Sequence, residues 1–388
     1  MLEIAIVGGG LCGLALANAL QAQGIGYAVF EGRTRLGGRI HSVKARSNGL
    51  ALDMGAAWFW PRTQPRVTRL VQDLGLACFP QHDTGKLLVL NDPEVKPTVM
   101  ELEDLHSGAQ RIAGGASALI DALAGRLESG NVHLGFTLVR LADLGSHLLL
   151  TFRHEQGTLD VLARQVVLAL PPRLVESCLD FEPPLNGQLR ETLRETPTWM
   201  AGNAKALAAF GRDDGMDEAG IDRAAFWRED GHSGNAVASH PRAVLGEIHD
   251  ACDAIGARAA LSGFFALSAS VRGAFRPGLP LLVRSQLAQI FGTRTQEAEI
   301  QVHDWAEEPL TCASLDRQPV DGHPAYANTL LQVPIWNGRL HFGGSETAAY
   351  GGGYMEGALE AAARLRREIL ATCAILAGPA RAAATCVS

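Results

Sequence analysis

Cysteine is sparse in this chain, and its spacing does not support a cross-linked or zinc-bound scaffold. The 388 residues include seven cysteines, scattered along the sequence without a Cys-x-x-Cys pair. Redox pairs and zinc sites usually need such close spacing, and secreted disulfide frameworks usually carry an even number of cysteines. We therefore expect reduced thiols in a cytoplasmic protein. No metal site is expected, because the histidines are dispersed as well.

Long apolar runs, basic patches and internal repeats are also missing. No window of about eighteen uninterrupted apolar residues occurs, so no membrane anchor is expected. The 34 Lys and Arg residues are outnumbered by 41 Asp and Glu, a formal net charge of -7, so nucleic acid is not an expected partner. The first strand-like segment starts at residue 4, so no signal peptide is expected. A Gly-x-Ser-x-Gly turn is absent, so a serine hydrolase is unsupported.

Glycine, in contrast, is abundant, and its first occurrences fall in a G-x-G-x-x-G pattern. A short apolar strand runs into Gly8, Gly10 and Gly13, and an apolar helix and a second strand follow. In such a βαβ unit the first glycine allows a tight turn, the second lets a diphosphate approach the backbone, and the third lets the helix lie close to the strand. Free N–H groups at the helix start favour the diphosphate. The segment therefore predicts binding of a dinucleotide through its ADP part.

A second glycine pair indicates which dinucleotide is bound, a flavin or a nicotinamide cofactor. The second strand ends at Glu31, which is placed to bind both ribose hydroxyls, and Gly37, Gly38 and Arg39 follow it closely. Nicotinamide dehydrogenases have no need of glycines there. Two-domain flavoproteins do, because the chain passes again beside the FAD diphosphate and a side chain would block it. Since Arg39 can also neutralise phosphate charge, FAD is the expected cofactor.

The length and the order of the elements suit two domains threaded through each other. We expect an α/β fold in which residues 1–78, 116–194 and 308–388 form a Rossmann-like FAD-binding domain. Residues 79–115 and 195–307 are expected to form an interleaved α+β substrate domain. Expected helices cover residues 64–76, 119–127, 281–291 and 355–369, and expected strands cover residues 4–7, 27–31, 50–55, 148–152, 161–170, 205–210, 244–248, 261–267 and 340–342.

Six short motifs follow one another along nearly the whole chain. They are Gly8-x-Gly10-x-x-Gly13, Leu36-Gly37-Gly38-Arg39, Asp53-x-Gly55-x-x-Trp58, Arg111-x-x-Gly114-Gly115, Ala169-Leu170-Pro171-Pro172, and a closing segment from Gly343-Gly344-Ser345-Glu346 to Gly352-Gly353-Tyr354-Met355. Each motif alone is a modest signal, but in this order they resemble the flavin monoamine oxidase family. The resemblance implies the two-domain fold of the glutathione-reductase and amine-oxidase type, with bound FAD.

The resemblance also implies a set of cofactor contacts. Glu346 is expected to accept hydrogen bonds from the ribityl chain, with a solvated acid as the alternative. Gly352 and Gly353 are expected to let the backbone touch the flavin ring, and Met355 to open the final helix toward the pyrimidine side. The expected cofactor-binding residues are Gly8, Gly10, Gly13, Glu31, Gly37, Gly38, Arg39, Gly55, Ala56, Trp58, Pro171, Gly344, Glu346, Gly353, Tyr354 and Met355.

Lys205 and Tyr354 are the expected catalytic residues. Lys205 stands in an apolar strand, where a charged side chain needs a reason. The resemblance implies that it holds a water against flavin N5 and assists the reaction with oxygen. A strand-end lysine that reaches solvent is the alternative. Tyr354 looks like one of two aromatic walls that guide an amine to the flavin in this family.

The expected substrate pocket departs from the family pattern. Ser314 stands where the family has its second aromatic wall, and Ala313 stands near the position of a cysteine that bonds the flavin in some members. Cys312 is one residue away, and non-covalent FAD is expected. The insertion after the aromatic run is short, so a more open pocket is expected, roofed partly by Trp58 and Trp60, although Trp60 is equally a candidate core residue. The expected pocket residues are Trp60, Cys312, Ser314 and Tyr354.

Oxidation of a small amine by FAD is the reaction that the resemblance implies. A hydride leaves the carbon next to the amine nitrogen, the imine hydrolyses to an aldehyde or ketone, and oxygen is reduced to hydrogen peroxide. Two alternatives stay open. One is an FAD-dependent oxidase or desaturase of a non-amine substrate, similar to renalase or porphyrinogen oxidase. The other is a flavoprotein assembly subunit with little turnover. Neither the particular amine nor the oligomeric state is predicted.

Overall fold

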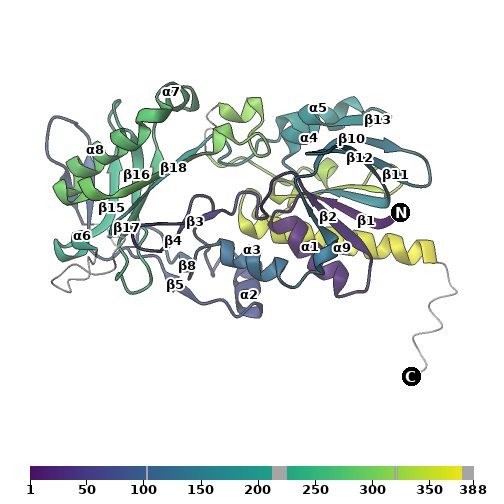
Figure 1. Ribbon diagram of the computed structural model, residues 1–388, viewed down its shortest axis with the longest axis horizontal. Helices are drawn as coiled ribbons and strands as arrows, with labels where there is room; N and C mark the ends of the chain where they lie inside the picture. Colours follow the sequence, from purple (N-terminus) through teal and green to yellow (C-terminus); the bar gives the residue numbers. More distant parts are fainter. Residues whose placement is uncertain (102–103, 212–224, 319, 321, 378–388) are drawn as a thin grey trace. The chain divides into compact units, whose positions relative to one another are not determined.

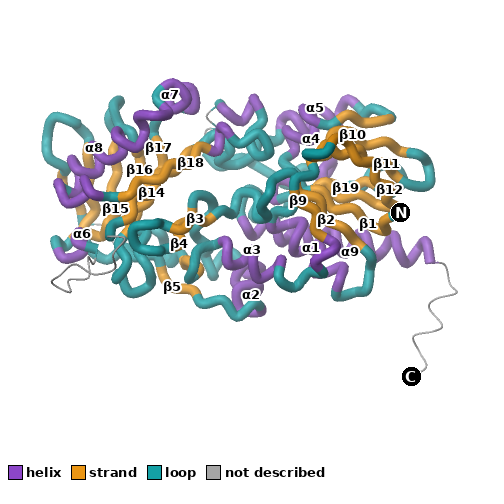
Figure 2. Tube along the Cα trace, in the orientation of Figure 1, coloured by secondary structure: helices purple, strands orange, loops and turns teal. Residues whose placement is uncertain are grey.

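The chain forms two compact units, each assembled from separate stretches of sequence (Figures 1 and 2). Unit 1 comprises Met1–Gly38, Ala122–Trp199 and Gly322–Ser388, and unit 2 comprises Arg39–Asp121 and Met200–Asp321. The computed structural model describes residues 1–101, 104–211, 225–318, 320 and 322–377, with side chains described up to residue 372. Each unit thus combines segments that lie far apart in the sequence.

The unit boundaries differ from the expected domain boundaries in a few places. Residues 39–78 and 308–321 group with unit 2 instead of with the dinucleotide-binding part, and residues 195–199 group with unit 1. Packing explains the first difference, because Leu50 and Leu52 lie in one apolar cluster with Leu207 of unit 2. Residues that follow the second glycine pair directly in sequence thus belong to the core of the other unit.

Unit 1 is built on an eight-stranded sheet. Its order is β13-β10-β11-β12-β1-β2-β9, and β19 also pairs with β12. Strands β2, β1, β12 and β19 are parallel neighbours, and β10 and β11 extend the sheet in antiparallel pairing with the start of β12. Buried runs in β1 and β2 are typical of parallel strands covered on both faces. The strands are β1 (Leu2–Val7), β2 (Tyr27–Glu31), β9 (Val132–Leu134), β10 (Thr137–Asp143), β11 (Leu148–His154), β12 (Gly157–Leu168), β13 (Asp180–Glu182) and β19 (Leu340–Phe342).

Four α-helices lie wholly within the described residues of unit 1. They are α1 (Leu11–Gln21), α4 (Pro172–Cys178), α5 (Gly187–Glu195) and α9 (Met355–Ala377). The first and last of these pack against each other, and Figure 1 shows α9 in yellow beside α1 in purple. Buried Ala358, Ala362, Leu365 and Ile369 follow the helical repeat, as the sequence predicts for the closing helix. This helix continues beyond the expected end at residue 369.

Unit 2 contains a seven-stranded sheet in the order β18-β14-β17-β16-β15-β6-β7. Its strands pair antiparallel except for the parallel pair β6 and β15. Two short antiparallel pairs, β3 with β4 and β5 with β8, accompany this sheet. The strands are β3 (Ser42–Lys44), β4 (Ala51–Asp53), β5 (Cys78–Pro80), β6 (Lys86–Leu90), β7 (Thr98–Met100), β8 (Gln110–Ile112), β14 (Ala204–Ala209), β15 (His232–Ala238), β16 (Leu245–Asp250), β17 (Ala260–Phe265) and β18 (Glu299–Asp304).

The two faces of this sheet are covered differently. Helix α8 (Leu279–Phe291) packs on one face, where Ala206 of β14 shares a core with Val283 of the helix (Figure 2). On the opposite face Leu207 packs with Leu52 of β4. Because side chains alternate along a strand, Lys205 belongs to this second face. The remaining helices are α2 (Pro65–Asp73), α6 (Phe226–Glu229) and α7 (Ala269–Ala274), together with α3 (Ser117–Ala124), within which the unit boundary falls.

The expected fold class is confirmed by these two units. Most expected helices and strands are present, with ends that differ by a few residues, as for α2 against the expected 64–76. Among the helices that the structure describes, none combines the length and the apolar character that crossing a bilayer requires.

Candidate cofactor and active site

The first glycine turn lies at the carboxyl end of β1. Gly8 has φ of +109°, and a Cβ there would lie 2.4 Å from the main-chain oxygen of Ala169. A Cβ on Gly13 would lie 2.1 Å from the oxygen of Gly8, so α1 approaches the turn closely. At Gly10 the nearest described atom beyond its neighbours would be the oxygen of Gly37, at 4.0 Å. The space beside Gly10 is therefore left open at the start of α1, where free N–H groups favour a diphosphate.

The second glycine pair lies directly beside the first turn. The amide of Gly37 donates to the oxygen of Gly9 at 2.8 Å, and Gly37 and Gly10 form a parallel bridge. Gly37 and Gly38 have φ of +102° and +58°, which side chains rarely tolerate. A Cβ on Gly38 would lie 3.5 Å from the Cα of Gly10. The sequence predicted this return of the chain to the turn.

The carboxylate of Glu31 is buried and held in a fixed orientation at the end of β2. Its Oε2 accepts from the amide of Gly9 at 2.8 Å, and its Oε1 accepts from the amide of Arg33 at 2.9 Å. An ionised carboxylate has further lone pairs, so both oxygens keep capacity for hydroxyl donors. The open space at Gly10, the start of α1 and this carboxylate together fit the ADP half of FAD.

The Gly343–Glu346 segment of the closing motif lies against the same part of unit 1. The amide of Gly344 donates to Sγ of Cys12 at 3.3 Å, and a Cβ on Gly343 would lie 2.9 Å from Cδ1 of Leu365. Glu346 is 1% exposed, and its Oε2 accepts from Oγ of Ser345 at 2.9 Å. Burial excludes the solvated-acid alternative for Glu346. Pro171 is the N-cap of α4.

The two glycines before α9 have a packing role within unit 1. A Cβ on Gly352 would lie 2.6 Å from Cβ of Tyr326, and a Cβ on Gly353 would lie 3.0 Å from Cβ of Trp199. Gly353 also has φ of +80°. Neighbouring aromatic side chains therefore account for both glycines, a reason that sequence inspection did not supply. Met355 is the first residue of α9, as predicted.

Tyr354 has an aromatic partner that the sequence analysis missed. Its ring stacks on the imidazole of His323, with centroids 4.9 Å apart and planes 6° apart. His323 in turn meets Trp199 edge to face at 4.8 Å. Tyr354 and His323 are both exposed in unit 1, so the stack forms part of its surface. Spacing could not reveal this pair, because His323 lies in an irregular segment far from the closing motif.

Lys205 is buried in unit 2 with only 2% of its surface exposed. Its Nζ donates to the main-chain oxygens of Asp53 at 2.9 Å and Gly55 at 3.1 Å. It also lies 5.4 Å from the ring centroid of Trp58 and 5.1 Å from that of Phe264. The solvent-reaching alternative is therefore excluded. Burial lowers the pKa of Lys205 to about 8, although Asp53 opposes the shift.

Three residues of one motif thus surround this lysine. The carbonyls of Asp53 and Gly55 accept its protons, and the indole of Trp58 faces it. The Asp53 carboxylate is turned elsewhere: its Oδ1 accepts from Oγ of Ser42 at 2.5 Å and from the amide of Ala116 at 2.8 Å. A Cβ on Gly55 would lie 1.8 Å from the oxygen of Arg39, which also accepts from the amide of Ala56 at 3.3 Å.

Next to Trp58 lies a buried group of polar side chains that the sequence analysis did not connect. The Trp58 indole donates to Oε1 of Gln81 at 2.8 Å and meets His249 edge to face at 5.0 Å. Nε2 of His106 lies 3.1 Å from Nδ1 of His249, and Nδ1 of His106 lies 2.6 Å from Oδ1 of Asp83. Asp83, His106 and His249 come from separate parts of the sequence, so their spacing gave no indication that these side chains are hydrogen-bonded to one another.

The other expected pocket residues occupy different settings in unit 2. Trp60 is half-buried and its indole donates to the main-chain oxygen of His106 at 2.7 Å. Cys312 is buried in a small cluster with Ala201, and burial, with Asp316 adding to it, raises the pKa of its thiol to about 11. Ser314 is exposed and starts a short 3₁₀ turn.

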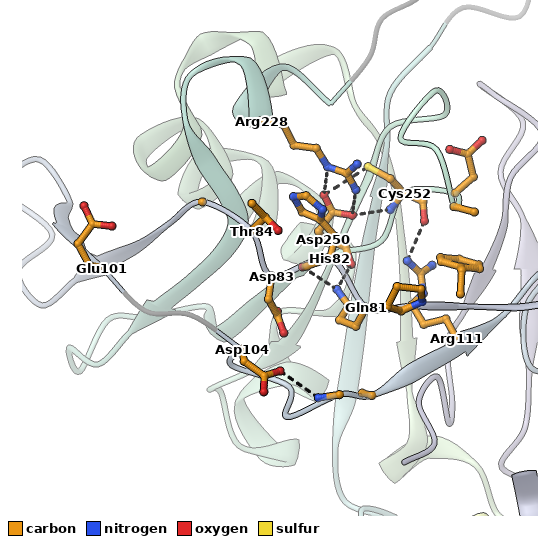
Figure 3. A pocket seen from close by; sticks show the side chains of 17 residues that line it. Gln81, His82, Asp83, Thr84, Glu101, Asp104, Arg111, Arg228, Asp250 and Cys252 are labelled. Atoms are coloured by element: carbon orange, nitrogen blue, oxygen red, sulfur yellow. Dashed lines mark hydrogen bonds and ion pairs between the residues drawn. The ribbon is translucent and has the colours of Figure 1, made fainter. Parts of the chain in front are cut away.

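A cavity of about 550 Å³ opens within unit 2 (Figure 3). One wall is an ion pair in which buried Asp250 accepts from Nε and Nη2 of Arg228, at 2.9 and 2.8 Å. Another is Arg111, which donates to the main-chain oxygen of Cys252 at 2.7 Å. Asp83 also lines this cavity. In the described part of the chain no group of three or more His, Cys, Asp or Glu residues is arranged to hold a metal ion.

Gly8, Gly10 and Gly13 form a glycine cradle at the start of α1. Together with the oriented carboxylate of Glu31 and the second glycine pair, this cradle defines a dinucleotide-binding protein of the two-domain flavoprotein class. The chain belongs to the flavin containing amine oxidoreductase family, whose sequence model matches residues 88–237 and 278–370. A second model, for an NAD(P)-binding Rossmann-like domain, matches residues 6–74.

Relatives and solved structures agree with this assignment. Amine oxidase [flavin-containing] A of Sus scrofa is 24% identical, with 95% of this chain and 85% of the relative aligned. A probable flavin-containing monoamine oxidase A of Dictyostelium discoideum is 22% identical, with 95% and 97% aligned. Putrescine oxidase bound to putrescine has a TM-score of 0.73 at 20% identity, covering 95% of this chain and 99% of that one. Cyclohexylamine oxidase from Brevibacterium oxydans IH-35A has a TM-score of 0.74 at 18% identity, covering 96% and 99%.

Family membership confirms three predictions made from the motifs. The chain is an FAD-dependent amine oxidase, its cofactor is FAD, and its fold is that of the two-domain amine oxidases.

Proposed function

We propose that this chain oxidises an amine at the carbon next to nitrogen, giving an imine that hydrolyses to an aldehyde or ketone, while oxygen is reduced to hydrogen peroxide. The observation that carries this proposal is the family match over residues 88–237 and 278–370. The glycine cradle of unit 1 supports it because the cradle is one of the family's motifs, and the buried lysine of unit 2 supports it because it contacts the Asp53-x-Gly55-x-x-Trp58 motif.

FAD would be held by residues from several segments. When bound, FAD supplies the two-electron acceptor for the amine. Gly10 and Gly37 leave room for the diphosphate, Glu31 accepts from the ribose hydroxyls, and Glu346 accepts from the ribityl chain. The further proposed contacts are Gly8, Gly13, Gly38, Arg39, Gly55, Ala56, Trp58, Pro171, Gly344, Gly353, Tyr354 and Met355.

Lys205 assists the reaction with oxygen in this proposal. Two of its three N–H groups donate to main-chain oxygens, so the third remains for a water molecule. A cation in an apolar setting stabilises negative charge that develops on oxygen as it is reduced. With a pKa of about 8, the side chain keeps its proton at neutral pH.

Tyr354 positions the amine, and its stack on His323 holds the phenol ring in place. Trp60, Cys312 and Ser314 line the remaining substrate path. The flavin is bound without a covalent link, since the buried Cys312 thiol is kept protonated and the thiolate is the nucleophilic form.

Anaerobic reduction of the FAD-loaded protein tests the proposal. Primary amines, diamines and amino acids are mixed with the holoprotein without oxygen, and the visible absorbance of oxidised flavin is followed. We expect at least one amine to bleach it, and air to restore it with stoichiometric hydrogen peroxide. Bleaching by reduced nicotinamides or a porphyrinogen alone would favour the non-amine alternative. A flavin that no compound reduces would favour an assembly role.

A further inference from the structure

Three polar side chains form a continuous hydrogen-bonded chain inside unit 2. Oδ1 of Asp83 lies 2.6 Å from Nδ1 of His106, and Nε2 of His106 lies 3.1 Å from Nδ1 of His249. Asp83 also accepts from Nδ2 of Asn235 and from the amide of His106, each at 2.9 Å. These two extra bonds hold the carboxylate at the outer end of the chain in place.

With both imidazoles neutral, the hydrogen bonds determine where each ring carries its proton. An ionised carboxylate only accepts, so His106 carries its proton on Nδ1 and leaves a lone pair on Nε2. That lone pair accepts a hydrogen bond from the N–H group at Nδ1 of His249. Nε2 of His249 is therefore unprotonated. Burial raises the pKa of Asp83, but the hydrogen bonds from the ring and amide of His106 and from Asn235 outweigh it, so the pKa is lowered and the carboxylate stays ionised.

The inner end of the chain is a buried acceptor with no hydrogen-bond partner. His249 is 5% exposed, and its Nε2 has no hydrogen bond within the described residues. Oε2 of Glu247 lies 3.8 Å from Nε2 of His249, on a side chain that is 64% exposed. Trp58 and Phe264, which face Nζ of Lys205, also pack edge to face against His249. The free lone pair therefore lies in the aromatic surroundings of the proposed catalytic lysine.

The outer end of the chain reaches the cavity of unit 2. Asp83 is one of the side chains that line it, and Figure 3 shows Asp83 between His82 and Asp104. A proton that arrives at Asp83 therefore has a water-accessible exit. The chain joins a buried lone pair beside Trp58 to this exit.

We propose that Asp83, His106 and His249 form a proton relay, in which Nε2 of His249 receives a proton from the ammonium group of the substrate and Asp83 passes one to the cavity. The relay rests on the proposed function, because only a neutral amine is oxidised. Nε2 of His249 and the carboxylate of Glu247 form a pair of acceptors for the ammonium group. His249 is thus a catalytic base, and His106 and Asp83 are positioning residues that act through it.

The proton transfers balance along the chain. An N–H bond of the ammonium group breaks as an Nε2–H bond forms on His249. The Nδ1 proton of His249 moves to Nε2 of His106, and the Nδ1 proton of His106 moves to Asp83, which releases it to water. One proton leaves and the neutral amine remains. Formation of hydrogen peroxide later takes up a proton, and transfer in the inward direction returns both imidazoles to their starting state.

The surrounding charges explain why a relay is needed. Burial lowers the pKa of His249 to about 3, with smaller effects in the same direction from His106 and Lys205, while Asp83 opposes them. His249 therefore does not hold a positive charge at neutral pH. Transfer through His106 moves the charge to the side of Asp83, where a carboxylate neutralises it. The carboxylate of Glu247 also lies close to Nε2.

Nitrogen NMR tests the proton positions without any turnover. The FAD-loaded protein is labelled with ¹⁵N-histidine, and the His249→Gln and His106→Gln variants assign the two residues. We expect both imidazoles to be neutral with the proton on Nδ1 at pH 7. A proton on Nε2 of His249, or a doubly protonated His106, would overturn the relay, whatever the activity of the protein.

The pH dependence of anaerobic flavin reduction by an amine tests the function of the chain. At pH 7 only about one in 10³ molecules of an alkylamine is neutral, given a pKa near that of lysine. We expect His249→Gln and Asp83→Asn to slow reduction at saturating amine by about 10²-fold at pH 7. At about pH 10 about a quarter of the substrate is already neutral, so the variants should come within about threefold of wild type.

Glu101→Gln is the matched control, because Glu101 lines the same cavity and is not part of the chain. It should keep the wild-type profile. An equal loss of rate at every pH in His249→Gln and Asp83→Asn would mean that the residues are structural and would overturn the relay. If the wild-type flavin is reduced by no amine, the proposed function fails, whereas the NMR result still decides the proton positions.

Discussion

The ammonium group of Lys205 donates to the main-chain oxygen of Asp53 at 2.9 Å, although 152 positions separate the two residues in sequence. The second acceptor, the oxygen of Gly55, belongs to the same motif. A glycine-containing segment and a buried lysine that look unrelated in sequence therefore form one local structure. Substitution of the lysine removes both hydrogen bonds, so its effects on oxygen reactivity and on stability have to be measured separately.

Lys205→Met should slow the reaction of reduced flavin with oxygen. Methionine keeps the length of the side chain but removes the positive charge and the N–H donor. We expect reoxidation to slow by about 10²-fold, the scale for losing one positioned donor, while anaerobic reduction by the amine changes far less. Stopped-flow mixing of the reduced protein with oxygen measures the rate. Lys44→Met, at an exposed lysine of the same unit, is the control, and an unchanged rate in Lys205→Met would make the lysine structural.

The stability of the protein should depend on pH through the same lysine. Its pKa is lowered from 10.5 to about 8 in the folded state. Between these values the unfolded chain binds the proton and the folded chain does not, so stability rises with pH across this interval. The free energy of unfolding of wild type relative to Lys205→Met should increase by about 3 kcal/mol from pH 8 to pH 10.5. Urea unfolding of both proteins at several pH values measures it, and a flat difference would contradict the lowered pKa.

Gly10→Ala and Gly13→Ala should have opposite consequences. A Cβ on Gly10 meets nothing closer than 4.0 Å, and its backbone is extended, with φ of -79°. We expect Gly10→Ala to keep its Tm without cofactor and to lose FAD affinity by at least about tenfold, since the methyl group occupies the diphosphate space. In Gly13→Ala the methyl group would lie 2.1 Å from the oxygen of Gly8, so the FAD-free protein itself should be destabilised.

Calorimetry and FAD titration of the two variants distinguish these effects. Normal FAD binding by Gly10→Ala would show that the cofactor does not approach this glycine. A Gly13→Ala protein with wild-type Tm would show that α1 has room to move away from the turn.

The flavin should leave the protein on denaturation. Burial keeps Cys312 as a thiol, with its pKa raised to about 11, so a covalent flavin link is not expected. Acid precipitation of the holoprotein should release all of the flavin into the supernatant, and Cys312→Ala should bind FAD as wild type does. Flavin absorbance that stays with the precipitated wild-type protein, and is lost in Cys312→Ala, would contradict this expectation.

His323→Ala should weaken amine binding through Tyr354. The two rings lie parallel with centroids 4.9 Å apart, an arrangement worth about 1 kcal/mol beyond simple burial. Loss of the stack frees the phenol ring, and KM for the amine should rise by about fivefold with little change in kcat. Tyr354→Ala should produce a larger rise. A wild-type KM in both variants would remove the pair from the substrate path.

Glycine conformation and strand order made the nucleotide-binding part of the fold predictable. Gly8, Gly10 and Gly13 act through backbone geometry within one βαβ unit, so their spacing in sequence translates directly into structure. The position of Gly37 beside Gly10 was predictable for the same reason. Lys205 was recognisable because a charged residue in an apolar strand requires compensation.

Contacts between distant segments were not predictable. Asp83, His106 and His249 meet only because β16 and two irregular segments come together in unit 2, and no local pattern marks any of them. Stacking of His323 on Tyr354 likewise depends on the path of an irregular segment. The expected boundary after residue 78 differs from the unit boundary after Gly38, because Leu50 and Leu52 pack against Leu207 of β14, which lies more than a hundred residues later.

The pairing of β19 with β12 bears on how this protein is made. Strand β1 of the nucleotide-binding sheet is synthesised first. Strand β19 and helix α9, which packs on α1, emerge from the ribosome only after residue 339. Until then, an apolar strand edge and one side of α1 stay uncovered. Such a nascent chain is a natural client for chaperones, and ribosome-stalled intermediates that end before residue 340 should be more sensitive to protease than the finished polypeptide.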